Sequence, residues 1–144
     1  MRKQSRRAAV ALGFLLTTAV AAGSCAPWRA ECSGAVFLRF RDAVASAESL
    51  DDVLPLLAGS TRKAHDVAAP EQRSAGLARL KQAAEHTEPK VDSARIVNDL
   101  CRIEVTAAAP SQRIEKGTYN FRGEGSAWKL VSWGWLDEHG NFPR

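Results

Sequence analysis

The side chains of this sequence that could do chemistry are few, and three cysteines and one tyrosine stand out among them. A cysteine thiol can be acylated, paired in a disulfide or bound to a metal, and a tyrosine phenol can hydrogen-bond a reacting oxygen. The sequence has no Cys-x-x-Cys pair and no Gly-x-Ser-x-Gly motif, which argues against a zinc site and a serine hydrolase. The histidines also lack the spacing of metal ligands, so no metal and no cofactor is predicted. The residues are Cys25, Cys32, Cys101, Tyr119, His65, His86 and His139.

The N-terminus has the organisation of an export signal. Basic residues come first, namely Arg2, Lys3, Arg6 and Arg7, and the apolar stretch Ala8–Ala22 follows them. That stretch has 15 residues, fewer than the roughly 20 that a membrane-spanning helix needs. The small residues Ala22-Gly23-Ser24 then precede Cys25, and together they resemble the lipobox of bacterial lipoproteins.

The lipobox resemblance implies that Cys25 is acylated and that the chain is cut before it. The expected organisation is a signal peptide at 1–24, a lipidated tether at 25–32 and one domain at 33–144. Stable anchoring takes more than one acyl chain. The protein would then face the periplasm of a bacterial envelope, and Ala26 in place of an aspartate favours the outer membrane. The alternative is ordinary secretion with cleavage after Ala22.

Cleavage changes the charge of the protein. The full chain has 20 basic and 16 acidic residues, and all the acidic ones follow Cys25. Loss of the basic residues before Cys25 leaves 16 basic and 16 acidic residues. The mature chain therefore lacks the excess of positive charge that is typical of nucleic-acid-binding proteins.

Two cysteines remain once Cys25 is lipidated. In an oxidising compartment two such thiols tend to pair, which predicts a Cys32–Cys101 disulfide. The alternative is that both are buried and unpaired.

Helical periodicity fills the first half of the mature chain. Ser49 and Asp52 form a capping box that opens a short helix, and Gly59 is expected to end it. Pro70 suits the first position of a longer helix. The predicted helices are Gly34–Ala47, a short one from Ser49, a turn at Ser60–Val67, and Pro70–His86.

After Pro89 the apolar residues recur with period two, which is typical of strands. The predicted strands are Val91–Val97, Leu100–Thr106, Ile114–Arg122 and Trp128–Leu136. Short connections predict a curved antiparallel meander of four strands, and helices followed by hairpins indicate an α+β fold. Simple alternation in the last strand puts Trp133 and Trp135 on one face and Trp128 and Leu130 on the other.

Two segments resemble the nuclear-transport-factor-2-like, or ketosteroid-isomerase-like, superfamily. Ile96–Val105 resembles its strand–turn–strand, and Gly125–Trp133 resembles its closing hairpin. The resemblance covers about residues 33–136 and is nearest to uncharacterised secreted or lipidated bacterial members. It implies that the sheet curls around the helices into a cone with a pocket at the open end.

Large aromatic side chains could line such a pocket or a partner surface, or could fill the core. These candidates are Phe37, Phe40, Tyr119, Phe121, Trp133 and Trp135. Enzymes of the superfamily place acids, bases or phenols in the pocket, and the acids nearest to such a role are Asp66, Asp92, Asp99 and Glu104. Asp99 is expected to serve a turn and Glu104 to face away from Cys101, so no catalytic residue is predicted.

Three functions are compatible with these features. The first is a non-enzymatic envelope lipoprotein that binds a protein partner or a small apolar ligand. The second is a periplasmic immunity or inhibitor lipoprotein directed at an envelope-targeting toxin. The third is a small enzyme of the isomerase or dehydratase kind, which would need two polar groups converging in an apolar pocket.

Overall fold

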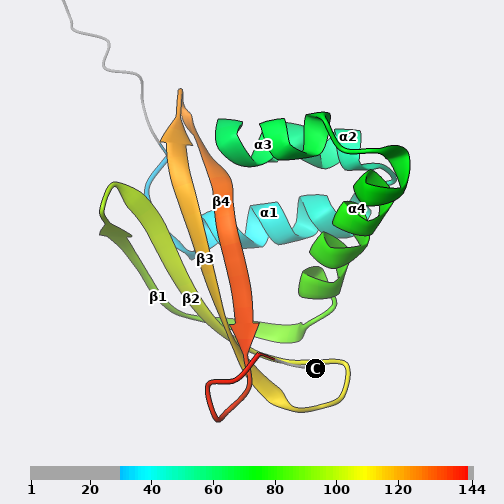
Figure 1. Ribbon diagram of the computed structural model, residues 1–144. Coiled ribbons are helices and arrows are strands. Elements are labelled where there is room, and N and C mark those ends of the chain that lie inside the picture. The colour runs from blue at the N-terminus through cyan, green and yellow to red at the C-terminus, as the bar shows by residue number, and fades with distance from the viewer. Residues whose placement is uncertain (1–29, 143–144) are drawn as a thin grey trace, which may run out of the picture.

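The computed structural model describes residues 30–142 of the chain. The expected signal peptide, the acylated Cys25 and residues 26–29 of the expected tether lie outside the described residues. Figure 1 shows the described part as helices packed against one side of a strongly twisted sheet, with α4 running beside the sheet towards the start of β1. Because the helices precede the sheet in the chain, the predicted α+β fold is confirmed.

The helices are α1 (Gly34–Ser46), α2 (Leu50–Val53), the 3-10 helix η1 (Leu54–Leu56), α3 (Gly59–Asp66) and α4 (Pro70–Ala84). The strands are β1 (Thr87–Val97), β2 (Leu100–Ala108), β3 (Ile114–Glu124) and β4 (Ala127–Leu136). They form one antiparallel sheet in the order β1-β2-β3-β4, which is the predicted meander.

The capping box at the start of α2 is present as predicted. One carboxylate oxygen of Asp52 accepts hydrogen bonds from the backbone N–H groups of Ser49 at 2.8 Å and Glu48 at 3.0 Å. These bonds hold the pKa of Asp52 below its usual value. The cap orients the first turn of a helix too short to be stable by itself.

The prediction that Gly59 ends this helix is wrong, because Gly59 begins α3. The reason is that the chain first touches the sheet. Leu57 pairs with Leu130 of β4, and the N–H of Ala58 donates to the Leu130 carbonyl at 2.8 Å. The N–H of Gly59 then donates to the Glu124 carboxylate at 2.9 Å. This bond gives a partner to one of the backbone N–H groups that have no acceptor within the first turn of α3.

The change from helix to strand also occurs earlier than predicted. Helix α4 ends at Ala84, so His86 lies outside it, and β1 already begins at Thr87. The strand runs through Pro89, which sits where the register with β2 is irregular between Thr87 and Lys90. Proline has no backbone N–H to donate to a neighbouring strand. It is tolerated at this position because β1 is an edge strand and its pairing with β2 is irregular there.

Strand β4 contains a β-bulge at Val131. Phe121 pairs with Leu130 and Asn120 pairs with Ser132, so Val131 is an extra residue between two consecutive pairs. One extra residue shifts the alternation of all later side chains to the opposite face.

The bulge corrects the predicted faces of the last strand. Trp133 pairs with the buried Tyr119, and it packs against the same hydrophobic core as Trp128, Leu130 and Trp135. The prediction that Trp128 and Leu130 face away from Trp133 and Trp135 is therefore wrong. These four side chains of β4 share the helix-covered face of the sheet.

The middle of that face is filled by aromatic side chains. The rings of Phe37 and Tyr119 are 4.7 Å apart, and those of Phe40 and Phe121 are 5.8 Å apart. The space left beside Tyr119 is about 10 Å³, which is at the lower limit for a single water. A pocket in the described domain must therefore lie towards an end of the sheet.

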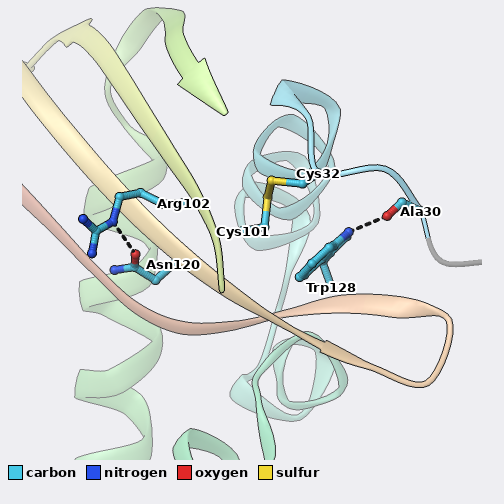
Figure 2. The surroundings of a disulfide bond; sticks show 6 residues. All are labelled: Ala30, Cys32, Cys101, Arg102, Asn120 and Trp128. Carbon is cyan, nitrogen blue, oxygen red and sulfur yellow. Dashed lines mark hydrogen bonds between the residues drawn. A yellow bond between two sulfur atoms is a disulfide. The ribbon is translucent and has the colours of Figure 1, made fainter. Parts of the chain in front are cut away.

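The structure joins Cys32 and Cys101 in a disulfide, which confirms the predicted pair. Their Cα atoms are 5.5 Å apart, and Cys101 is fully buried in β2. Figure 2 shows the bond beside a second attachment, in which the Trp128 indole N–H donates to the Ala30 carbonyl at 2.6 Å. The start of the described chain is thus fixed to two strands.

Candidate ligand-binding cleft

A cleft of about 660 Å³ lies at the end of the sheet where α4 leads into β1. Its walls come from the last turns of α4, the loop between β2 and β3, the end of β4 and the C-terminal segment. In Figure 1 these segments meet below the helices, near the label of the C-terminus. The volume falls within the range of roughly 300–1,000 Å³ that is usual for small-molecule sites.

A histidine and a carboxylate form a buried pair in this cleft. His86 Nε2 and Glu115 Oε2 are 2.8 Å apart, and the residues are 8% and 3% exposed. Arg41 donates to the backbone carbonyl of His86 at 3.2 Å, which helps to fix the turn after α4. A buried carboxylate is costly without a hydrogen-bonding partner, so His86 stabilises Glu115 in this position.

The pair supports an aromatic wall of the cleft. The His86 ring stacks on the Trp135 indole with centroids 3.7 Å apart and planes within 5° of parallel. The Trp135 N–H in turn donates to the Tyr119 hydroxyl at 3.1 Å. Gly117 is the cross-strand partner of Trp135, and a Cβ built on it would lie 3.0 Å from three ring atoms. The Trp135 ring can therefore occupy this position because residue 117 lacks a side chain.

We predict that Gly117→Ala lowers the free energy of unfolding by about 1–3 kcal/mol, because the added methyl group collides with the rigid Trp135 ring. Denaturant unfolding would measure this loss. Gly134→Ala is the matched control in the facing strand, since its Cβ would meet only a Phe142 ring atom at 3.9 Å. Equal stability of the two variants would contradict the argument.

Tyr119 gives a second prediction. Burial raises the pKa of Tyr119 to about 12, although its hydrogen bond from Trp135 and the nearby Arg41 act in the opposite direction. An unfolded tyrosine has a pKa near 10. Below about pH 10 the phenol is therefore protonated in both the folded and the unfolded chain, and its contribution to the free energy of unfolding is fully present. Above that pH the unfolded chain ionises first, and we expect the free energy of unfolding to fall by roughly 1.4 kcal/mol per pH unit until about pH 12.

Because Tyr119 is the only tyrosine in the chain, the near-ultraviolet absorbance of tyrosinate reports this residue alone. The folded protein should titrate about two pH units above the denatured protein. Coincident titrations would show that the phenol is not buried as described.

The rim of the cleft is exposed and charged. Arg79 of α4 and Arg113 of the β2–β3 loop lie among its lining residues, and both are exposed. Within residues 30–142 neither forms an ion pair, and Arg113 has only a long 3.4 Å contact to the Ser111 hydroxyl. Glu85, the residue after α4, is the acidic group on the same rim.

The structure separates the predicted aromatic candidates into two groups. Trp133 and Trp135 line the cleft. The other four are buried in the core, where they pack on one another; these are Phe37, Phe40, Tyr119 and Phe121. Phe40 also borders a smaller groove of about 220 Å³ next to Trp128.

None of the acids considered for an enzyme lines the cleft, and these are Asp66, Asp92, Asp99 and Glu104. Asp99 lies in the β1–β2 turn with a positive φ of 62°, which confirms its expected turn role. Glu104 pairs with Arg95 at 2.9 Å and accepts a hydrogen bond from Ser93, on the sheet face opposite Cys101. The predicted orientation of Glu104 is confirmed.

His86 and Glu115 are functional candidates that the sequence patterns did not single out. A signal for Glu115 existed, because period two in β3 puts it on the same face as the buried Tyr119 and Phe121. A charged residue on a core-facing position indicates a partner or a function. No comparable signal marked His86, since its contact with Glu115 depends on how α4 meets the sheet.

The fold and cleft define a small α+β domain with a ligand-sized opening at one end of its sheet. No protein family, no curated protein and no solved structure matches this chain. Among the described residues, no helix is long and apolar enough to cross a membrane. The same residues contain no group of three or more His, Cys, Asp or Glu side chains that could hold a metal ion.

Proposed function

We propose that this protein is a non-enzymatic bacterial envelope lipoprotein that binds a small, largely apolar ligand in the cleft. Cys25 is its acylated residue, and the domain faces the periplasm, with the outer membrane favoured. The observation that carries the binding function is the cleft itself, which is lined by Trp133, Trp135 and the His86–Glu115 pair.

The construction of the cleft supports binding by a preformed site. Trp135 is held by the stacked His86 ring and by the close approach of Gly117, and its N–H is fixed by Tyr119. A rigid aromatic wall loses little conformational entropy when a ligand packs against it. Trp133 is only partly buried, so it offers indole surface that a ligand can cover.

The His86–Glu115 pair is less well suited to an isomerase- or dehydratase-like enzyme. A histidine that acts as a general base needs a free ring nitrogen within hydrogen-bond reach of the substrate. His86 Nε2 is bonded to Glu115, and Nδ1 is buried without a hydrogen-bond partner among the described residues. This geometry suits a histidine that positions Trp135 better than one that exchanges protons with a bound molecule.

The membrane anchor is tested by Cys25→Ser in the full chain. We expect the variant to leave the membrane fraction and to lose labelling by an alkyne fatty acid, since the acylated thiol is gone. Cys32→Ser is no suitable control because it breaks the disulfide, so Ser24→Ala serves instead and should stay labelled. A Cys25→Ser variant that distributes like the parent would favour ordinary secretion.

Ligand binding is tested by the indole N–H signals in nuclear magnetic resonance spectra of the lipid-free mature chain from Ala26. Compounds from a small-molecule library that enter the cleft should shift the signals of Trp133 and Trp135. The Trp128 signal is the internal control, because this indole donates to Ala30 at the opposite end of β4. A library that shifts neither cleft signal would contradict the proposed function.

A further inference from the structure

The cationic rim of the cleft suggests a more specific ligand chemistry. Four arginines of the described domain form ion pairs with carboxylates, at Asp42, Asp66, Asp51 and Glu104. Arg79 and Arg113 form none within residues 30–142, although both line the same cleft. They come from two walls, since Arg79 belongs to α4 and Arg113 to the β2–β3 loop.

Two acidic side chains also line the cleft, and only one of them lies at its exposed rim. Glu115 is buried and already bonded to His86 at 2.8 Å. Glu85 is the one acidic side chain that the described part of the chain adds at the exposed rim. The exposed rim of this cleft thus holds two guanidinium groups and one carboxylate, while two acidic side chains that follow β4 lie in an adjoining groove that one of these guanidinium groups also borders. A carboxylate on the ligand would complement the two guanidinium groups.

We propose that the cleft binds an apolar molecule that carries one carboxylate, with its apolar body against Trp133 and Trp135 and its carboxylate between Arg79 and Arg113. Guanidinium groups bind carboxylates through paired, charge-assisted hydrogen bonds. The aromatic wall lies deeper in the cleft than the exposed arginines, since Trp135 is 8% exposed. A carboxylate at the rim would also keep its remaining hydration.

This inference rests on the proposed binding function, and the test separates the two. The probes are 2-naphthoate, the neutral 2-naphthalenemethanol and the cationic 2-naphthylmethylamine, titrated by the Trp133 and Trp135 indole signals. We expect 2-naphthoate to bind about tenfold tighter than the alcohol, as charged hydrogen bonds at a partly exposed site would give. Added salt should reduce that preference because the arginines are exposed.

Arg79→Gln and Arg113→Gln should each weaken 2-naphthoate binding severalfold and leave the alcohol unaffected. Arg122→Gln is the matched control, since Arg122 is exposed, forms no ion pair within the described chain and lies outside the cleft lining. Equal affinities for acid and alcohol, or tighter binding of the amine, would overturn the inference while leaving the binding function in place. If none of the probes and no library compound shifts a cleft signal, both proposals fail.

Discussion

Replacing both Cys32 and Cys101 by alanine is expected to lower the free energy of unfolding by about 4 kcal/mol. The two residues are 69 positions apart, so the disulfide closes a long loop in the unfolded chain. The chain-entropy model assigns roughly this value to a loop of that length. A small domain has a total stability of about 5–15 kcal/mol, so the loss would be a large part of it.

Urea unfolding of the lipid-free chain from Ala26 measures this effect. The control is Ser33→Ala, which changes a neighbour of Cys32 whose side chain makes no cap hydrogen bond with α1. It should unfold close to the parent. If the double alanine variant were as stable as the parent, the disulfide would contribute nothing, and the attachment through Trp128 and Ala30 would suffice to fix the chain start.

Replacing His86 by leucine is expected to lower the free energy of unfolding by about 3 kcal/mol or more. The substitution leaves the Glu115 carboxylate, which is 3% exposed, without the partner it has at 2.8 Å. Breaking a buried pair by removing one member is more costly than replacing both members, because a charge remains in an apolar surrounding. The stacking on Trp135 is lost as well.

The double variant His86→Leu/Glu115→Leu provides the control. With no buried charge left, it should be more stable than His86→Leu alone, although it carries one more substitution. Indole spectra add a local readout, since the Trp135 signal should shift in both variants and the Trp128 signal should not. Additive losses in the two single variants and the double variant would show that the two side chains do not stabilise each other.

Much of the architecture follows from local patterns in the chain. The capping box of Ser49 and Asp52, Pro70 at a helix start and period two in β2 and β3 each gave an element that the structure contains. The cysteine count after Cys25 predicted the disulfide that the structure shows. These features depend on residues a few positions apart or on simple pairing.

The errors arose where one element meets another. Gly59 looked like a helix end, but pairing of Leu57 and Ala58 with β4 ends the helix earlier and lets Gly59 start the next one. The bulge at Val131 reverses the alternation, so the predicted faces of the tryptophans were wrong. A bulge depends on the register with the neighbouring strand and leaves no clear mark in a single sequence.

Composition and order along the chain were therefore enough for the α+β class, the meander and the Cys32–Cys101 bond, because local periodicity and the pairing of two thiols decide them. Only the tertiary structure decided that the middle of the sheet is filled and its end is open. His86 and Glu115 are 29 residues apart, and their contact exists because the turn after α4 brings the histidine to the start of β3. The cleft depends on such long-range packing, which neighbouring residues in the sequence do not encode.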